Sequence, residues 1–356
     1  MQLQAQEGLL FTYRSGLSSR GLLAWVVALG LTAFYLALYF TEIFTPLALA
    51  LGLPSKWTLY GALYTLVMIG GGARYLSKHG SSRYNRVRIG VNVAVQAVLA
   101  FSLPFAQSKL GAHEFYFSYL WPLKIEYLYP ATFVELPIYL GIYSVVASFV
   151  AVPILTLRYG KRWYCSWVCG CGALANTFGD PWRHLSSKSE RAWTVEKITV
   201  HSTLALALIT TVIVAANWAF GATHPDFAAF GFEVQRFYGF FVGAILSGIV
   251  GVAVYPILGP RVWCRYFCPM AALLGLLQKL GRFRVAVKPD MCIACGNCST
   301  YCEMGIDVRA YAMRNQSFTR ASCVGCGMCS HVCPRGVLRL DTKGAAHARL
   351  PVLPSR

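Results

Sequence analysis

Two cysteine runs near the C-terminus constrain this chain more than any other feature. Each run has two, two and three residues between its successive cysteines, and the second run ends in Cys-Pro. The runs consist of Cys292, Cys295, Cys298 and Cys302, followed by Cys323, Cys326, Cys329 and Cys333. Ligands at such short intervals can reach three irons of one cubane from a single tight loop. The spacing therefore predicts a loop-rich module built around two [4Fe–4S] clusters.

The spacing also predicts which cysteines share a cluster. In bacterial two-cluster ferredoxins, the fourth cysteine of each run binds the cluster of the other run. We expect cluster 1 to be held by Cys292, Cys295, Cys298 and Cys333, and cluster 2 by Cys302, Cys323, Cys326 and Cys329. Structural zinc is the alternative, but zinc sites normally use two ligand pairs separated by a long spacer. Three closely spaced ligands with a distant fourth favour iron–sulfur clusters.

Three glycines between these cysteines are expected to take backbone conformations that other residues avoid. Gly296, Gly325 and Gly327 would allow the loops to curl without a clash of a Cβ atom. One position departs from the ferredoxin pattern, because Glu303 follows Cys302 where proline is typical. This departure weakens a turn but removes no ligand.

The rest of the chain is too apolar for a soluble domain. Of the 356 residues, 56% are hydrophobic and only 13% are charged, whereas soluble domains contain about 25% charged residues. Since about 20 apolar residues cross a bilayer, we expect six membrane-spanning helices. Their expected ranges are 22–40, 57–72, 89–105, 137–157, 198–220 and 237–258, the second being the shortest. The expected fold class is an α-helical integral membrane protein with a C-terminal α+β two-cluster bacterial ferredoxin-like domain.

The distribution of basic residues predicts the orientation in the membrane. The net charge is +18, and most Lys and Arg residues lie in segments 73–88 and 158–197 and in the tail from 259 onward. Cytoplasmic loops carry such an excess, so both termini and every cysteine are expected on the cytoplasmic side of the inner membrane. The charge is thereby explained by topology, and nucleic acid is not an expected partner. The expected divisions are a cytoplasmic N-terminus (1–21), a multi-pass membrane domain (22–280), the ferredoxin-like domain (281–340) and a tail (341–356).

A second repeat lies in two loops of the membrane domain, 160–175 and 259–274. The two loops share six residues at a constant offset of 99: a glycine, an arginine, two cysteines, an alanine and a leucine. This repeat indicates an internal duplication. Each copy contains a Cys-x-x-x-Cys pair, which places both sulfurs on one face of a helix. The two pairs are Cys165 with Cys169 and Cys264 with Cys268, and Cys171 has no counterpart. They are expected to hold a third Fe–S cluster or a soft metal ion, or to cycle between dithiol and disulfide; buried structural cysteines are the remaining alternative.

The outward loop 106–136 is rich in aromatic residues. An aromatic belt at the membrane interface is the simplest interpretation. A docking surface or a lid on a quinone pocket is the alternative, in which Glu114, Glu126 and Glu135 would handle protons. Haem is not expected, because only His201 lies well inside an expected span.

The order of spans, duplicated cysteine loops and two-cluster tail resembles the NapH/NosR/CcoG-type membrane 4Fe–4S ferredoxin family. The segment from Trp263 to Pro269 and the two cysteine runs carry this resemblance. Cys169 is followed by Gly170 rather than proline, and no N-terminal FMN-binding domain of the NosR kind is expected, so the resemblance is to the membrane and ferredoxin half. It implies electron transfer to extracytoplasmic redox partners, often reductases of anaerobic respiration.

The expected function is electron transfer through two [4Fe–4S] clusters. The expected donor is a cytoplasmic ferredoxin or flavodoxin, or the quinone pool, and the acceptor an extracytoplasmic flavoprotein or reductase. In this interpretation the chain is an oxidoreductase subunit, such as a quinol dehydrogenase component, and the basic tail docks an acidic donor. The alternative is a copper-handling or assembly factor for a respiratory reductase or oxidase, acting through Cys165, Cys169, Cys264 and Cys268. A copper-binding assay on a variant lacking these four cysteines discriminates between the two.

Overall fold

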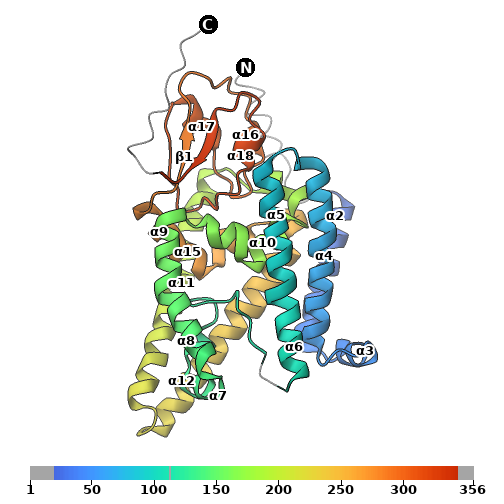
Figure 1. Cartoon of the computed structure of the whole chain (residues 1–356), viewed down its shortest axis with the longest axis vertical. Coiled ribbons are helices and arrows are strands. Elements are labelled where there is room, and N and C mark those ends of the chain that lie inside the picture. Colours follow the sequence, from blue (N-terminus) through green and yellow to red (C-terminus); the bar gives the residue numbers. More distant parts are fainter. Residues whose placement is uncertain (1–19, 112–113, 344–356) are drawn as a thin grey trace.

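The protein is a bundle of long helices that carries a small cysteine-rich module at one end (Figure 1). The structure is a computed structural model that describes residues 20–111 and 114–343. The predicted fold class, a helical membrane protein with a C-terminal α+β ferredoxin-like domain, is confirmed. The predicted tail beyond residue 343 and nearly all of the predicted N-terminal segment lie outside the described residues.

Five helical stretches are long and apolar enough to cross a membrane, which makes the chain a multi-pass membrane protein. Three of these stretches contain a π-helical segment between regular helical segments; the label η marks both π-helical and 3-10 helical segments. The stretches are α2 (Leu22–Phe40); α5 (Arg83–Gln96) with η2 (Ala97–Ser102) and α6 (Leu103–Lys109); α8 (Ile138–Val146) with η4 (Ala147–Ala151) and α9 (Val152–Tyr159); α11 (Glu190–Phe220); and α12 (Pro225–Tyr238) with η7 (Gly239–Val250) and α13 (Gly251–Ala253).

The expected second span, 57–72, is helical but is not one of these five. It lies within α4 (Lys56–His79), which begins at Ser55, whose Oγ accepts a hydrogen bond from the backbone N–H of Thr58. With 24 residues, α4 is about 36 Å long and could cross the hydrocarbon core. Its last turns contain basic residues, and it is less apolar than the five stretches. It nevertheless runs beside α5 over the height of the bundle (Figure 1).

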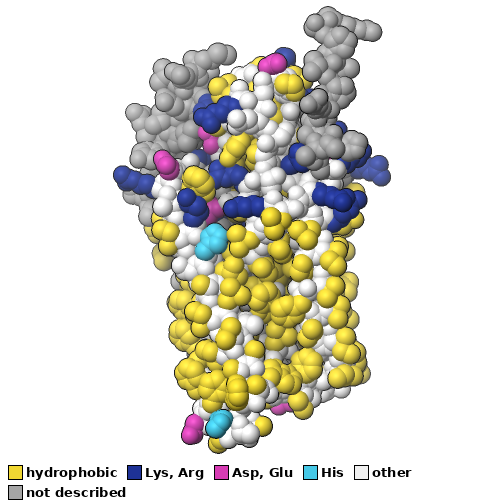
Figure 2. All heavy atoms as spheres, turned by 90° about the vertical axis from the view of Figure 1, so that its left-hand side faces the viewer, with side chains coloured by type: hydrophobic (Ala, Val, Ile, Leu, Met, Phe, Trp, Pro, Cys, Tyr) yellow, Lys and Arg dark blue, Asp and Glu magenta, His cyan; other side chains and the backbone are white. Residues whose placement is uncertain are grey.

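The outer surface of the bundle is apolar, and its basic residues are concentrated near the module. Figure 2 shows a wall of hydrophobic side chains with a belt of Lys and Arg between this wall and the module. Leu29, Leu66 and Val212 are examples of side chains that are more than half exposed on the described helices. Such a surface matches a bilayer bounded by basic residues on one side.

Two segments of short helices fill the module end of the bundle. Each follows a glycine with positive φ, Gly160 (76°) or Gly259 (96°), where a side chain would strain the backbone. The first consists of η5 (Trp163–Val168), α10 (Gly170–Asn176) and η6 (Asp180–Leu185); the second follows α14 (Tyr255–Leu258) and consists of η8 (Trp263–Phe267) and α15 (Pro269–Leu280). These are the duplicated loops of the sequence, and both copies lie between the bundle and the module.

The cysteine-rich module is closed by a two-stranded antiparallel sheet. Its first strand, β1 (Arg284–Val287), pairs with its last strand, β2 (Leu338–Asp341), with Arg284 opposite Asp341. Between them lie α16 (Asn297–Thr300), α17 (Val308–Met313) and α18 (Met328–His331). The strands thus hold the two ends of the module together while the cysteine loops lie between them.

The aromatic outward loop folds back into the bundle instead of lying on its surface. Phe115 and Tyr127 are buried and stack on each other, with ring centroids 4.4 Å apart. Two hydrogen bonds from bundle tyrosines, Tyr164 to the Ser118 carbonyl (2.6 Å) and Tyr238 to the Pro122 carbonyl, anchor the loop. The remaining outer elements are α3 (Phe44–Ala50), η3 (Ile125–Leu128) and α7 (Pro130–Glu135).

Candidate functional site

The structure groups the eight module cysteines around two cavities. One cavity, here called the inner cavity, is lined by Cys302, Cys323, Cys326 and Cys329. The other, the outer cavity, is lined by Cys292, Cys295, Cys298 and Cys333. The fourth cysteine of each run therefore lies beside the first three of the other run. These are the two sets expected from the spacing, and their role as cluster ligands stays a prediction.

The two halves of the module repeat their backbone geometry at an offset of 31 residues. Gly296 and Gly327 both precede a short helix and adopt left-handed conformations, with φ of 83° and 79°. The expected positive φ is therefore present at these positions and also at Gly325. Backbone N–H groups donate to the fourth cysteine of each run, from Ile306 to Cys302 Sγ (3.4 Å) and from Val337 to Cys333 Sγ (3.3 Å). Such bonds stabilise thiolates and tune the clusters that thiolates bind.

The inner cavity lies against the helical bundle. The loop that carries Cys323 and Cys326 accepts hydrogen bonds from bundle side chains: from Tyr84 to the Gly325 carbonyl (2.9 Å) and from Ser166 to the Val324 carbonyl (2.6 Å). The lining of the outer cavity comes entirely from module residues, and Cys295 there is exposed. The outer cavity thus faces away from the membrane domain, whereas the inner cavity is in contact with it.

A buried ion network joins the inner cavity to the bundle. Glu303, next to Cys302, has no exposed surface and pairs with Arg183 (Nη1–Oε2, 2.7 Å) and Arg261 (Nη2–Oε1, 2.8 Å). Burial by itself would raise the pKa of the Glu303 carboxyl, but the neighbouring arginines outweigh burial and hold this pKa at about 2. Glu303 is therefore ionised at neutral pH, and Arg183 also reaches Cys326, with Nη1 4.0 Å from Sγ.

Positive charge exceeds negative charge in this buried region. Arg88 is fully buried and donates to Asn176 Oδ1 (2.8 Å) and to the Tyr75 hydroxyl (2.8 Å), both neutral acceptors. Lys161 is also buried and donates to the Ala321 carbonyl (3.1 Å). Buried cations are stable only beside opposite charge. This donor set fits anionic iron–sulfur clusters with their thiolate ligands.

The duplicated loops bring five cysteines together beneath the module. Cys165, Cys169, Cys264 and Cys268 are buried in one core cluster, and Cys171 packs against it. We call these five residues the thiol cluster. Burial raises the pKa of Cys165 to about 12, although the ammonium of Lys161 opposes this effect. A hydrogen bond from Cys171 lowers the pKa of Cys169 to about 7.

The two loops share their hydrogen bonding as well as their sequence. The N–H of Cys169 donates to the Tyr164 carbonyl (2.8 Å), and the N–H of Cys268 donates to the Trp263 carbonyl (2.9 Å) at the same offset of 99 residues. Cys169 and Cys268 each occupy the N-cap position of the helix that follows, and the Cys268 sulfur accepts a hydrogen bond from the N–H of Ala271. The internal duplication inferred from the sequence is therefore present in the backbone.

Polar side chains on α5 hold the first loop in place. Asn92 donates to the carbonyls of Ser166 (2.9 Å) and Trp167 (2.8 Å), and Gln96 donates to that of Val168 (2.6 Å). These carbonyls lack helical partners because the chain is irregular here, and unsatisfied backbone groups are costly within a membrane protein. The polar residues of α5 therefore compensate for the irregular backbone that carries Cys165 and Cys169.

The described residues contain no site for a single metal ion. Within residues 20–111 and 114–343, no three His, Cys, Asp or Glu side chains are arranged to hold one metal ion. A four-iron cluster separates its ligand sulfurs more widely than one ion does, so this result concerns mononuclear sites.

Comparison with known proteins identifies the class of protein to which this arrangement belongs. A family model described as a 4Fe-4S dicluster domain matches residues 285–340. A second, described as a 4Fe-4S binding domain, matches residues 142–190 and 241–288, which contain the two copies of the duplicated loop. The cofactors of the chain are accordingly [4Fe–4S] clusters. No solved structure matches the chain.

Three relatives match parts of the chain, and the names of two describe electron-transport or ferredoxin-type proteins. The putative electron transport protein YccM of Escherichia coli is 24% identical over 46% of this chain and 46% of its own length. The methylamine utilization ferredoxin-type protein MauN of Methylobacillus flagellatus is 25% identical over 40% of this chain and 49% of its own length. The uncharacterized protein MJ0749 of Methanocaldococcus jannaschii is 30% identical over 16% of this chain and 24% of its own length. The matched region thus spans about half the length of the first two relatives. The chain is homologous to these ferredoxin-type 4Fe–4S proteins.

The ion network around Glu303 was not expected from the sequence. In the sequence Glu303 stands where proline is typical, and this acidic residue beside Cys302 is the local signal that points to a buried basic partner. Arg261 belongs to the repeated motif, but its offset partner Arg162 faces the Phe283 ring instead. The two copies of the motif have therefore diverged in the role of this arginine.

Proposed function

We propose that the chain is a membrane-bound electron-transfer protein that passes electrons between a cytoplasmic donor or the quinone pool and an extracytoplasmic redox partner. When bound, the two [4Fe–4S] clusters would supply one-electron carriers. The outer cavity would receive the cluster held by Cys292, Cys295, Cys298 and Cys333. The inner cavity would receive the cluster held by Cys302, Cys323, Cys326 and Cys329. We also propose that the chain is related to the NapH/NosR/CcoG-type proteins that its sequence resembles.

The observation that carries the proposal is a single arginine that contacts both cysteine-bearing regions. Arg261 donates to Glu303 beside the inner cavity, and its Nη1 lies 3.7 Å from Cys264 Sγ in the thiol cluster. The inner cavity is thereby held against the membrane domain at the place where the second cysteine loop begins. This arrangement supports a route from the exposed outer cavity, through the inner cavity, to the thiol cluster.

The thiol cluster is the proposed third station of this route. Its four paired cysteines are buried beside Lys161 and Arg261, whose charges favour thiolates or an anionic centre. The outward loop reaches this region from the opposite side, where Tyr164, next to Cys165, bonds Ser118. The loop provides a protein path between the thiol cluster and the extracytoplasmic surface, to which we assign the redox partner.

The proposed orientation places the module and both termini in the cytoplasm of a bacterial-type cell. The belt of Lys and Arg beside the module supports it (Figure 2), because basic residues accumulate on the cytoplasmic side. The proposal includes α4 as a sixth crossing, since an even number of crossings returns the chain to the side from which it started.

Metal analysis tests the cofactor content. About eight iron and eight acid-labile sulfide per chain are expected for two clusters, and about twelve of each if the thiol cluster also binds one. The matched variant replaces Cys165, Cys169, Cys264 and Cys268 with serine. It should keep about eight iron; copper bound by the wild type and lost from this variant would favour metal handling instead.

Electron transfer is tested in sealed proteoliposomes that contain a trapped ferricyanide acceptor. Dithionite added on the module side should reduce the acceptor through the wild-type protein. The four-serine variant should retain its module clusters but reduce the acceptor at least tenfold more slowly, a change of about 1.4 kcal/mol in barrier. Transfer by this variant at the wild-type rate would remove the thiol cluster from the route, and absence of iron from the wild type would overturn the whole proposal.

A further inference from the structure

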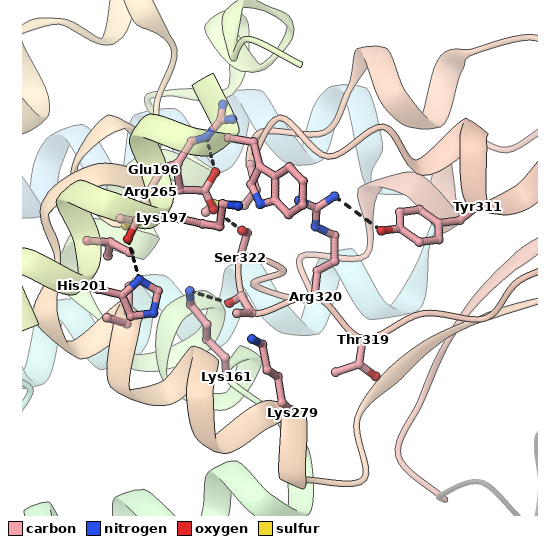
Figure 3. Close-up of a pocket in the computed structure, with 17 residues that line it drawn as sticks. Lys161, Glu196, Lys197, His201, Arg265, Lys279, Tyr311, Thr319, Arg320 and Ser322 are labelled. Atoms are coloured by element: carbon pink, nitrogen blue, oxygen red, sulfur yellow. Dashed lines mark hydrogen bonds and ion pairs between the residues drawn. The ribbon is translucent and has the colours of Figure 1, made fainter. Parts of the chain in front are cut away.

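We infer that the protein binds a phosphate group in a basic pocket between the membrane domain and the module. The pocket is a cavity of about 250 Å³ between α11, α15 and the module loop 319–322 (Figure 3). Five of its lining residues are cations that come from separate parts of the chain. These residues are Lys161, Lys197, Arg265, Lys279 and Arg320. This inference does not depend on the electron-transfer route.

The negative charge in the pocket wall does not balance these cations. Glu196 is the carboxylate of the lining, and it is already bound to Arg265 Nε (2.7 Å) and to the Ser322 hydroxyl. Within the described parts of the chain, Lys161, Lys197, Lys279 and Arg320 form no ion pair with a carboxylate. The pocket therefore has a surplus of positive charge that the carboxylate of its lining does not balance.

Part of the positive charge of the pocket is buried, because Lys161 lies in the protein interior. Its side chain is 2% exposed, and its Nζ donates to the carbonyl of Ala321 (3.1 Å). An ammonium has three donors, and a buried charge without a counter-ion is costly. The thiol cluster and the inner cavity lie near enough to neutralise Lys161, but they do not contact Lys279 or Lys197 at the mouth of the pocket. An external anion best accounts for the combined set.

Two of the mouth cations are held in position by an aromatic ring. Lys197 and Arg320 both lie over Trp193, with their charged groups 4.2 Å and 4.4 Å from a ring centroid. Arg320 also donates to the hydroxyl of Tyr311 (3.4 Å). These contacts reduce the conformational freedom of long side chains, so less entropy is lost when they bind an anion.

The shape and position of the pocket favour a phosphate carried by a lipid. Guanidinium and ammonium groups that converge from several directions suit the oxygens of a phosphate. The floor of the pocket is apolar, with Val200, Ala271 and Ala272, and the neighbouring Leu276 and Leu280 on α15 are exposed. Residues of α11 and α15 line the pocket, and Lys and Arg residues form a belt beside the hydrophobic wall of the bundle (Figure 2). An anionic phospholipid could place its headgroup in the pocket and its chains along the bundle, and a soluble phosphate compound would use the same cations.

The ligand would lie next to both redox regions of the molecule. Cys264 belongs to the lining, and Ser322 directly precedes Cys323 of the inner cavity. A bound phosphate would hold α11, α15 and the module loop together. Binding should therefore also protect the module from dissociating from the bundle in detergent.

The test uses the full chain, purified with its clusters in detergent and stripped of lipid. The probes are short-chain phosphatidylglycerol, glycerol 3-phosphate, and a short-chain diacylglycerol that lacks phosphate. The pocket variant is Lys279→Gln with Arg320→Gln, and the matched control is Lys288→Gln with Arg339→Gln, two module cations outside the lining. Iron content verifies that both variants are folded. If the pocket variant loses iron, the single variant Lys279→Gln replaces it.

We expect phosphatidylglycerol to bind the wild type and the control variant with equal affinity. It should bind the pocket variant about thirtyfold more weakly, because each of the two basic residues contributes about 1 kcal/mol beside an anionic lipid. If glycerol 3-phosphate bound the wild type as tightly as phosphatidylglycerol does, the pocket would still be a phosphate site, and its ligand would be a soluble phosphate compound. The inference would be overturned if phosphatidylglycerol bound the pocket variant as tightly as the wild type. It would also be overturned if the diacylglycerol bound the wild type as tightly as phosphatidylglycerol does.

Discussion

Arg261 and Glu303 form an ion pair with no solvent exposure, in which Nη2 lies 2.8 Å from Oε1. Arg261 belongs to the second duplicated loop of the membrane domain, and Glu303 belongs to the module. Arg183 pairs with the other carboxylate oxygen of Glu303. The junction between the two parts of the molecule is therefore electrostatic at its centre, and it lies directly beside the inner cavity.

Replacing Glu303 with glutamine should strongly destabilise this junction. Glu303→Gln leaves Arg261 buried without a carboxylate and Arg183 with Asp180 alone, and breaking a buried pair costs about 3–5 kcal/mol. Thermal unfolding in detergent, followed by tryptophan fluorescence, measures the effect. Glu233→Gln is the control, because Glu233 pairs with Arg236 on the surface, where loss of a pair costs about 0–1 kcal/mol. Equal unfolding curves for the two variants would contradict a structural role of the network.

The pairing of the cysteine runs can be tested by combining substitutions. Cys302→Ala with Cys323→Ala removes two ligands of one predicted cluster, so about four iron per chain should remain. Cys302→Ala with Cys298→Ala removes one ligand from each predicted cluster and should lower the iron content further. Iron analysis and EPR of the reduced proteins measure both outcomes. If the second pair retained more iron than the first, the crossed assignment would be wrong.

The first cysteine loop should not tolerate a side chain at Gly172. A Cβ atom there would clash with the backbone carbonyl of Cys165, next to the side chain of Arg261. Gly172→Ala should cost about 1–3 kcal/mol and make the thiol cluster reactive toward a membrane-permeant maleimide. Gly90→Ala is the matched control, because a Cβ atom at Gly90 meets no atom within 4 Å; it should leave both stability and reactivity near the wild-type values.

The topology is tested with reporter fusions on either side of α4. A reporter joined after residue 54 should be active outside the cytoplasm, and one joined after residue 81 should be active inside it, because Lys78 and the basic start of α5 favour the cytoplasmic side. A dual reporter, with phosphatase and fluorescence read from the same fusion, measures both locations. The same location for both fusions would show that α4 does not cross the membrane.

Several features were predictable because they are local or periodic in the sequence. The cysteine spacing indicated loops that curl at Gly296 and Gly327, and both residues have positive φ. The crossed grouping of Cys302 with the second run followed from the same spacing, and the structure places these residues around one cavity. Apolar runs located the five stretches that could span a membrane, whereas α4 is less clearly a span because glycine, tyrosine and basic residues interrupt its apolar run.

Other features depend on contacts between residues that are far apart in the chain. Arg88, Arg183, Arg261 and Glu303 meet at one place although more than 200 residues separate the first from the last. The inward fold of the aromatic outer loop similarly depends on Tyr164 and Tyr238, which belong to later segments. No periodicity encodes such contacts, because each arises only when the helices pack.

The sequence by itself determined the chemistry of the cofactors, the membrane class and the internal duplication. These properties depend on ligand spacing, hydrophobic length and motif offset, which are independent of tertiary packing. Only the tertiary structure decided that the duplicated loops lie beneath the inner cavity, that Arg261 joins them to Glu303, and that unpaired cations converge in the pocket beside α11. Burial decided these features, since a buried charge must find a partner wherever the fold brings one within reach.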